Sequence, residues 1–239
     1  MAKLVFDIET NAQPLENFDE VQQEYLFREL TKIEGDAQRE LRRAELTRAL
    51  NLWPLTAHVI CVAMLNAESG RGQVLFTAGD FEDETPAAGV VEFVPCVDET
   101  ELLTAFWDVA RHYDSIVTFN GRGFDVPFIY LRSAILNVPI SQKNWLGYRY
   151  QIEPHCDLAE QLTFYGVSGR DGAARKFNLD FYCKAFGIES PKSQGVTGMD
   201  VGDLAAEGKS REIAEYCLRD VQATLLLHQI WKERLAGIK

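Results

Sequence analysis

The chain lacks a long hydrophobic run. No segment approaches the roughly 20 apolar residues of a membrane-spanning helix, and we expect no secretory signal, since strand-like sequence begins at Lys3. A Cys-x-x-Cys pair and a Walker-type phosphate loop are also missing. The five cysteines lie mostly in apolar stretches, so we expect reduced core thiols in a cytoplasmic protein. The missing hydrophobic run predicts no membrane association, and His155 and Cys156 lack partners at zinc-like spacing, so we expect no zinc site.

Positive charge is scarce as well. The 24 Lys and Arg residues face 36 Asp and Glu residues, which gives a net charge of -12. At face value this charge disfavours binding to a polyanion. The excess lies entirely in the first half, because residues 1–113 hold 21 acids and 9 bases whereas residues 114–239 hold 15 of each. A local basic surface therefore stays compatible with the sequence.

The hydrophobic patterning predicts an α/β protein with a mixed sheet covered by helices. With 239 residues, 46% of them hydrophobic, we expect a single domain over residues 1–239. The predicted strands are 3–10, 58–65, 73–79 and 115–120, with 89–96 as either a further short strand or an irregular edge segment. The predicted helices are 98–113, 124–136, 157–163, 178–186 and 210–235. Residues 16–50 predict two further helices that break near Gly35 and form an insertion after the first strand, and "SPKSQGVTGMD" predicts a loop.

The first strand, "KLVFDIET", carries two acids in an otherwise core-like segment. Side chains alternate along a strand, so Asp7 and Glu9 share a face with Val5. Burying an unpaired charge costs several kcal/mol or forces protonation. The pair therefore needs protons, cations or water, unless this face is exposed or forms a structural salt bridge.

The last predicted helix places a third acid on its apolar side. At about 100° per residue, Asp220 falls within the apolar stripe, while Glu215 and Arg219 occupy the opposite, solvated side. Tyr216 lies one turn before Asp220 on the same side. Core packing is the alternative role for Tyr216.

Asp125 in "NGRGFD" lies between a strand end and a helix start, where capping the helix is the simplest role. Taken with Asp7, Glu9 and Asp220, however, it makes a set of four acids with few bases nearby in sequence. Carboxylates that converge repel one another, and hard divalent cations with oxygen ligands relieve that repulsion. We therefore expect a two-metal site suited to phosphodiester chemistry.

These segments resemble a known family. In order and spacing, "DIE", "NGRGFD" and "YCLRD" resemble the three motifs of the DnaQ-like, or DEDD, 3'-5' exonucleases, and Tyr-x-x-x-Asp resembles the DEDDy branch. The histidine branch needs His where this chain has Glu215. Residues 98–133 are similar to the proofreading exonuclease domain of family B DNA polymerases, and the resemblance covers residues 1–9 and 58–235.

The resemblance implies a ribonuclease H-like fold and a metal-dependent 3'-5' exonuclease that uses two Mg²⁺ or Mn²⁺ ions. We expect its substrate to be nucleic acid with a free 3' end, single-stranded DNA above all. By matching position, Asp7 would bridge both ions, and Glu9 and Asp220 would ligate the ion that holds the attacking water. Asp125 would support the second ion. Tyr216 would orient the water, since a phenol with a pKa near about 10 is a poor base.

Weaker signals surround these motifs. Candidate nucleic-acid-binding residues are Asn120, Phe124, Arg175, Lys176 and Lys192, for which a turn, core packing and loop solubility are the alternatives. Phosphate contact or simple solvation are the two interpretations of the insertion's arginines, Arg39, Arg42, Arg43 and Arg48. We expect Asp157 to give structural support.

Two other functions stay open. A nucleic-acid-binding or scaffold protein would keep the same fold without cleavage. A haloacid-dehalogenase-type phosphatase needs Asp-x-Asp, and this chain has Glu9 at the second acidic position. Since the sequence shows no polymerase-like segment, we expect the protein to act alone or through a protein partner that the sequence does not identify.

Overall fold

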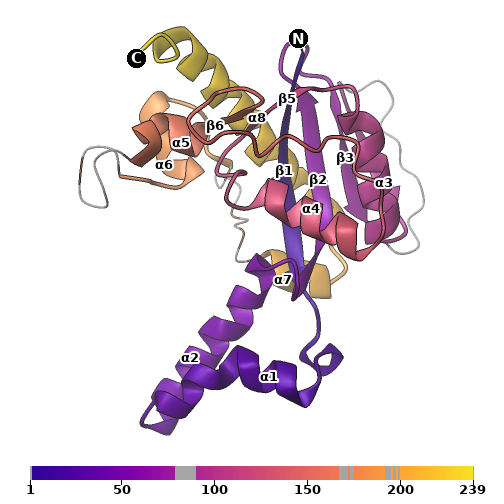
Figure 1. Ribbon diagram of the computed structural model, residues 1–239, viewed down its shortest axis with the longest axis vertical. Helices are drawn as coiled ribbons and strands as arrows, with labels where there is room; N and C mark the ends of the chain where they lie inside the picture. Colours follow the sequence, from indigo (N-terminus) through magenta and orange to yellow (C-terminus); the bar gives the residue numbers. More distant parts are fainter. Residues whose placement is uncertain are drawn as a thin grey trace.

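A six-stranded mixed sheet forms the centre of the computed structural model, with helices on both faces (Figure 1). The structure describes residues 2–78, 90–166, 172, 175–191, 195, 198 and 200–238. The strands, in the spatial order β4-β3-β2-β1-β5-β6, are β1 (Lys3–Ala12), β2 (Ala57–Asn66), β3 (Gly72–Thr77), β4 (Val91–Cys96), β5 (Ser115–Thr118) and β6 (His155–Asp157). β1 runs antiparallel to β2 and parallel to β5. The predicted α/β class and mixed sheet are confirmed.

The predicted helices are all present, with ends shifted by a few residues. The α-helices are α1 (Glu20–Phe27), α2 (Asp36–Ala49), α3 (Glu99–Ala110), α4 (Asp125–Ile135), α5 (Leu158–Leu162), α6 (Leu179–Phe186), α7 (Val201–Ala206) and α8 (Ser210–Arg234). Short 3-10 helices are η1 (Leu15–Asn17), η2 (Arg28–Lys32), η3 (Leu50–Leu52) and η4 (Phe164–Gly166). The sequence did not predict β6 or α7. The predicted loop at 190–200 lies partly outside the described residues.

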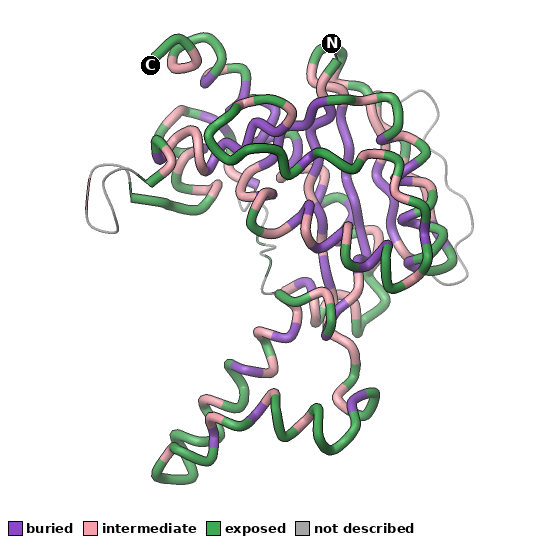
Figure 2. The backbone as a smooth tube through the Cα atoms, viewed as in Figure 1, coloured by how far each residue is buried: buried purple, intermediate pink, exposed green. Residues whose placement is uncertain are grey.

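The two faces of β1 pack into different cores. Leu4, Phe6 and Ile8 join the cluster formed with α3, α4 and Trp145, whereas Val5 joins the cluster formed with α8. The alternation predicted for this strand is therefore confirmed, and Asp7 and Glu9 lie on the α8 side. Figure 2 shows the sheet as the most continuously buried part of the chain.

The face of β1 that carries the acids is covered by α8. Its predicted apolar stripe is buried throughout: Ile213, Cys217, Val221, Thr224, Leu225, His228 and Trp231. All five cysteines are buried and free. Among the described residues, no helix is both long and apolar enough to cross a membrane.

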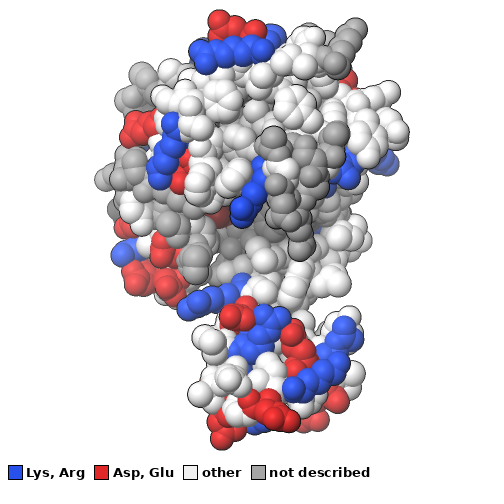
Figure 3. All heavy atoms as spheres, turned by 90° about the vertical axis from the view of Figure 1, so that its left-hand side faces the viewer, with Lys and Arg blue, Asp and Glu red and all other residues white. Residues whose placement is uncertain are grey.

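Residues 13–56, here called the arm, leave the sheet after β1 and return to it at β2 (Figure 1). The arm has a small apolar cluster of its own, centred on Phe27, Leu30 and Leu46. Gly35, with a φ of 91°, precedes α2, so the predicted break between two helices is confirmed. Most of the arm is exposed or half-buried, and basic and acidic side chains are interspersed over it (Figures 2 and 3).

Candidate active site

β1 carries Asp7 and Glu9 past the end of its pairing with β5. The parallel register joins residues 3–5 to residues 115–117, while β2 continues to pair along the other edge of β1. The β1–β2 register shifts between Glu9 and Thr10, and such bulges bend a strand and redirect its side chains. Both acids are half-buried and lie beside the carboxyl end of β5.

Asp125 reaches the strand edge that β5 leaves unpaired. Its Oδ1 accepts a hydrogen bond from the backbone N–H of Ile8 at 3.2 Å, between residues 117 positions apart. Asp125 is only 2% exposed and is the first residue of α4. The residue before the helix is Phe124, and no side chain caps it. The simple capping role is therefore wrong, because the carboxylate is turned toward β1.

The turn between β5 and α4 is fixed by Asp157. Its carboxylate accepts hydrogen bonds from the backbone N–H groups of Asn120 at 2.9 Å and Arg122 at 3.0 Å, and it also caps α5. Asn120 has a φ of 69°, a conformation that Asn tolerates better than most residues. A Cβ at Gly121 would lie 2.4 Å from Oγ1 of Thr118, so this position requires glycine. These contacts support the structural role expected for Asp157.

α8 brings Tyr216 and Asp220 to the same place. The Cys217 thiol, at the same level of the helix, donates a hydrogen bond to the backbone carbonyl of Asp7 at 3.5 Å. Tyr216 is 5% exposed, and its hydroxyl hydrogen-bonds to the Asp220 carboxylate. α8 thereby holds the Tyr216 phenol and the Asp220 carboxylate against β1.

A cleft of about 730 Å³ opens over these residues. Asp7, Glu9, Tyr216 and Asp220 line it, and Asp125 lies buried behind Asp7. The structure thus brings all four predicted acids and the predicted tyrosine together from three distant segments.

Burial and mutual repulsion raise the pKa values of the clustered acids. Burial, followed by the charges of Asp125, Asp220 and Glu9, raises the pKa of Asp7 well above its ordinary value. Burial, followed by the charges of Asp220 and Asp125, likewise raises the pKa of Glu9. Burial raises the pKa of Asp125 to about 7. Without cations, part of this cluster holds protons near neutral pH.

The donor atoms suit a hard divalent cation. Ligand atoms of Asp7, Glu9 and Cys217 lie within 4.8 Å of one another. Burial raises the pKa of the Cys217 thiol well above its ordinary value, and the thiol already donates to the Asp7 carbonyl, so it is no ligand for such an ion. The carboxylate oxygens of the cluster remain, and they are the ligands that Mg²⁺ and Mn²⁺ prefer.

The weaker candidates are placed less uniformly. Phe124 lines the cleft and packs on Phe128. Asn120 accepts a hydrogen bond from the Lys176 ammonium, and neither residue is among those that line the cleft. Arg175 instead lies over the ring of Phe177, 5.1 Å from its centroid, and is not among the lining residues. Lys192 lies outside the described residues.

Several residues of the cleft were not predicted from the sequence. Glu45, Asn51 and Leu52 belong to the arm, and Asn178 and Asp180 to the start of α6. None of them belongs to a motif. The arm residues come near the acids because α2 runs back toward β1. The local sequence does not predict this direction.

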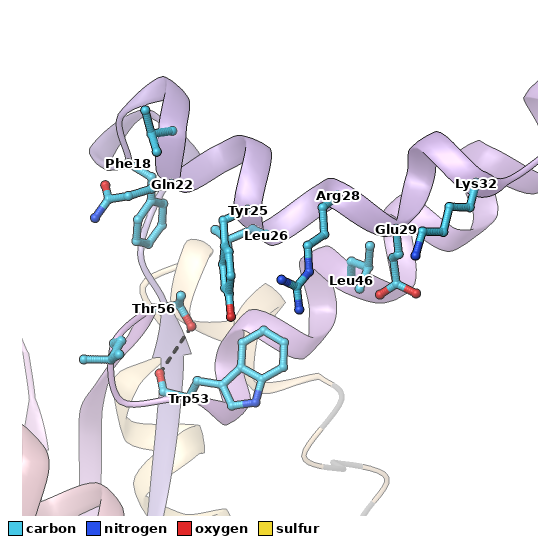
Figure 4. Close-up of a pocket in the computed structure, with 12 residues that line it drawn as sticks. Phe18, Gln22, Tyr25, Leu26, Arg28, Glu29, Lys32, Leu46, Trp53 and Thr56 are labelled. Carbon is cyan, nitrogen blue, oxygen red and sulfur yellow. Dashed lines mark hydrogen bonds between the residues drawn. The ribbon is translucent and has the colours of Figure 1, made fainter.

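A second hollow, of about 1100 Å³, lies between α1 and the segment that follows α2 (Figure 4). Its walls are largely apolar, and Tyr25 points toward Trp53 across it. Arg28 and Lys32 lie along one side. Because none of the four clustered acids lines it, this hollow is separate from the candidate active site.

A known protein family matches most of the chain. Residues 56–234 match a family described as a predicted 3'-5' exonuclease related to the exonuclease domain of PolB. The chain belongs to this family. The matched range holds Asp125, Tyr216 and Asp220, while Asp7, Glu9 and almost all of the arm precede it. The resemblance predicted from the motifs is confirmed.

Relatives of this family member include archaeal polymerases. The chain is 25% identical to DNA polymerase 1 of Saccharolobus solfataricus over 178 residues, covering 71% of this chain and 19% of the polymerase. It is 30% identical to DNA polymerase 1 of Sulfolobus acidocaldarius over 180 residues, with the same two coverages. The chain therefore spans about a fifth of the length of these relatives.

Among solved structures, the family B DNA polymerase of Pyrobaculum calidifontis has a similar fold. It aligns with a TM-score of 0.56 and 19% identity, over 97% of this chain and 24% of the polymerase. The ribonuclease H-like fold predicted for the chain is the fold that this similarity shows. Unlike the family match, this alignment covers nearly the whole chain, so it extends beyond residues 56–234.

Proposed function

We propose that this protein is a metal-dependent 3'-5' exonuclease that hydrolyses phosphodiester bonds at the 3' ends of nucleic acid. The observation that carries the proposal is the convergence of Asp7, Glu9, Asp125 and Asp220, with Tyr216, at one cleft. Membership of the exonuclease family supports it. Because the cleft is lined by the arm as well as the sheet, we propose that residues 1–239 act as a single domain.

Asp7, Glu9, Asp125 and Asp220 would hold two divalent ions, Mg²⁺ or Mn²⁺. Their crowding supports this assignment, because burial and then the charges of neighbouring acids raise the pKa values of Asp7 and Glu9, and bound cations relieve both effects. When bound, such ions activate water and stabilise the negative charge on the phosphate and the leaving oxygen. The charges of Asp125, Asp220 and Glu9 all act on Asp7.

Tyr216 would position the attacking water rather than take its proton. Burial, with the charges of Asp220 and Glu9, raises the pKa of this phenol above its ordinary value of 10.0. The hydroxyl therefore keeps its proton at neutral pH and acts through hydrogen bonds. Hydrolysis forms a bond from the water oxygen to phosphorus and breaks the bond to the 3' oxygen of the preceding nucleotide, which releases a nucleoside monophosphate.

Single-stranded DNA is the substrate that we favour, since the curated relatives are DNA polymerases. The lining of the cleft is partly apolar and includes Phe124 and Leu52, and such surfaces accept unpaired bases. The five free, buried cysteines favour a cytoplasmic location.

Incubation of the purified protein with a 5'-labelled oligodeoxynucleotide and Mg²⁺ or Mn²⁺ tests the proposal. We expect a ladder of products shortened from the 3' end. Asp7→Ala and Asp220→Ala should abolish the ladder while circular dichroism stays unchanged, because they remove metal ligands rather than packing. Asp108→Ala, at an exposed aspartate on α3, is the matched control and should cleave like the wild type.

The outcome that contradicts the proposal is a folded wild-type protein that yields no ladder with either ion. Calorimetric titration with Mn²⁺ then distinguishes the remaining possibilities. A scaffold protein has no need of the ions and would show no binding. Full activity of Asp7→Ala or Asp220→Ala would instead refute the site assignment.

A further inference from the structure

The arm supplies one wall of the candidate active-site cleft. Glu45, Arg48, Ala49 and Leu52 all line it, and their spacing places them on one side of α2 and its extension η3. Because the family match begins at residue 56, this wall lies outside the matched range. Phe124 and the start of α6 line the same cleft.

Hydrogen bonds fix the arm against β1 just beyond the acids. The Thr10 hydroxyl donates to the Asn51 carbonyl at 2.7 Å, and the Ala12 N–H donates to the Asn51 side chain. The Gln13 N–H donates to the Thr56 carbonyl at 2.8 Å. Arg48 precedes Asn51 by about one helical turn. Its backbone is therefore held at a defined place relative to Glu9.

Arg48 differs from the other arginines of α2 because its guanidinium has no ion-pair or ring partner among the described residues. The other three arginines of the helix are engaged, Arg39 by Asp36, Arg42 by Glu29 and Glu45, and Arg43 by the ring of Phe27. Within the described ranges, Arg48 forms no ion pair or ring contact and is exposed. It is also the one Lys or Arg, among those residues, that lines the cleft.

We infer that Arg48 binds a backbone phosphate of the single strand whose 3' end occupies the carboxylate cluster, so that the arm is part of the substrate-binding site. The inference rests on the proposed function. A polyanion that enters this cleft meets Asp7, Glu9 and Asp220, whose charges the ions offset only locally. A guanidinium in the lining of the same cleft supplies attraction and a planar pair of donors for phosphate.

Binding without turnover tests the inference. A fluorescently labelled oligodeoxythymidine of about ten nucleotides is titrated with protein by anisotropy, in Ca²⁺ and at salt concentrations from about 50 to 200 mM. Gel electrophoresis after each titration verifies that the oligonucleotide is intact. The variants are Arg48→Ala, Arg48→Lys and, as the matched control on the same helix, Arg39→Ala.

Arg48→Ala should weaken binding about tenfold, the value of one hydrogen bond between charged groups. The slope of log K against log salt is negative, and for Arg48→Ala its magnitude should be smaller than that of the wild type by about 0.7. This is the increment for one phosphate contact on a single strand. Arg48→Lys should retain most of that slope because it keeps the charge. Arg39→Ala, whose side chain pairs with Asp36 near the far end of the helix, should match the wild type in both quantities.

Equal affinities and slopes for Arg48→Ala, Arg39→Ala and the wild type would overturn the inference, even if the wild-type protein cleaves its substrate. A lowered slope for Arg48→Ala in a protein that never cleaves would support phosphate binding by the arm and contradict the exonuclease proposal. Absence of oligonucleotide binding by the wild type would overturn the inference, and together with the absence of a ladder in the cleavage assay it would overturn both.

Discussion

Asp125 is deeply buried, and its carboxylate forms a hydrogen bond with the backbone of β1. Burial raises its pKa to about 7, and its Oδ1 accepts the Ile8 N–H. Asp125→Asn keeps an acceptor oxygen for Ile8 but removes the charge. We expect loss of exonuclease activity and weaker Mn²⁺ binding by calorimetry, together with a melting temperature in EDTA at least as high as that of the wild type. Full activity of this variant would remove Asp125 from the metal site.

Tyr216 is expected to act through its hydroxyl group and not through its ring alone. Tyr216→Phe preserves the packing of the ring, which is 5% exposed, and removes the hydrogen bond to Asp220. We expect kcat to fall by up to about a hundredfold, the cost of misplacing a reacting group by roughly 1 Å. Because the phenol is no base, the pH dependence of kcat should keep its shape. A lost alkaline limb in the Tyr216→Phe profile would contradict the positioning role.

At this scale, the predictable residues were those whose polarity disagrees with their local pattern. Asp7 and Glu9 stand out on a core strand, and Asp220 stands out on the apolar stripe of a helix. The partner of Asp125 is different, since the Ile8 N–H is free only because β5 stops pairing with β1 at residue 5. No local sequence pattern reports the length of a strand pairing.

Among the secondary-structure elements, a buried ion pair ties α3 to α4. Arg132 and Glu99 are joined at 2.6 Å, with side chains 8% and 9% exposed. Glu99 also accepts the Val59 N–H, and Arg132 donates to the Pro54 carbonyl at the base of the arm. The pair therefore links the sheet, two helices and the segment that carries the arm back to β2.

Arg132→Ala leaves Glu99 buried without its cation, so the free energy of unfolding should fall by about 3–5 kcal/mol. Arg111→Ala, which breaks the exposed pair with Asp108, is the control and should cost less than about 1 kcal/mol. Urea denaturation followed by circular dichroism measures both. Equal losses in the two variants would mean that the Glu99–Arg132 pair contributes no more than a surface contact.

The elements themselves were largely predictable, because hydrophobic periodicity dictates where long helices and alternating strands form. β6 is three residues long, too short for alternation to register, and its place depends on pairing with β5. The arm shows the same limit. Its two helices follow from composition and Gly35, whereas its role as a wall of the cleft depends on the Asn51 contacts with β1.

For the whole molecule, the distribution of charge explains how a protein of net charge -12 is compatible with a polyanionic substrate. Part of the acidic excess lies in the cleft, where ions would offset it. Arg48 lines that cleft from the arm. The relevant field is therefore the local one with ions bound, and not the net charge of the bare chain.

The stability of the metal-free protein should depend on pH through the clustered acids. In the unfolded chain these carboxyl groups have pKa values of about 4. In the folded protein burial raises the pKa of Asp125 to about 7, and it raises the pKa values of Asp7 and Glu9 as well. Between those values the folded state binds more protons than the unfolded state, so this contribution to stability is full at low pH and is lost as the pH rises.

Buried His155 and His228, with pKa values lowered to about 3 and about 4, act in the opposite sense. The comparison with Asp125→Asn isolates the acid. In EDTA, the melting temperature of the wild type relative to Asp125→Asn should decline from about pH 5 to about pH 8. Mn²⁺ should raise the wild-type melting temperature more at the higher pH, since it binds deprotonated carboxylates. A pH-independent difference and an equal effect of Mn²⁺ at both pH values would contradict a shared site for protons and metal at these acids.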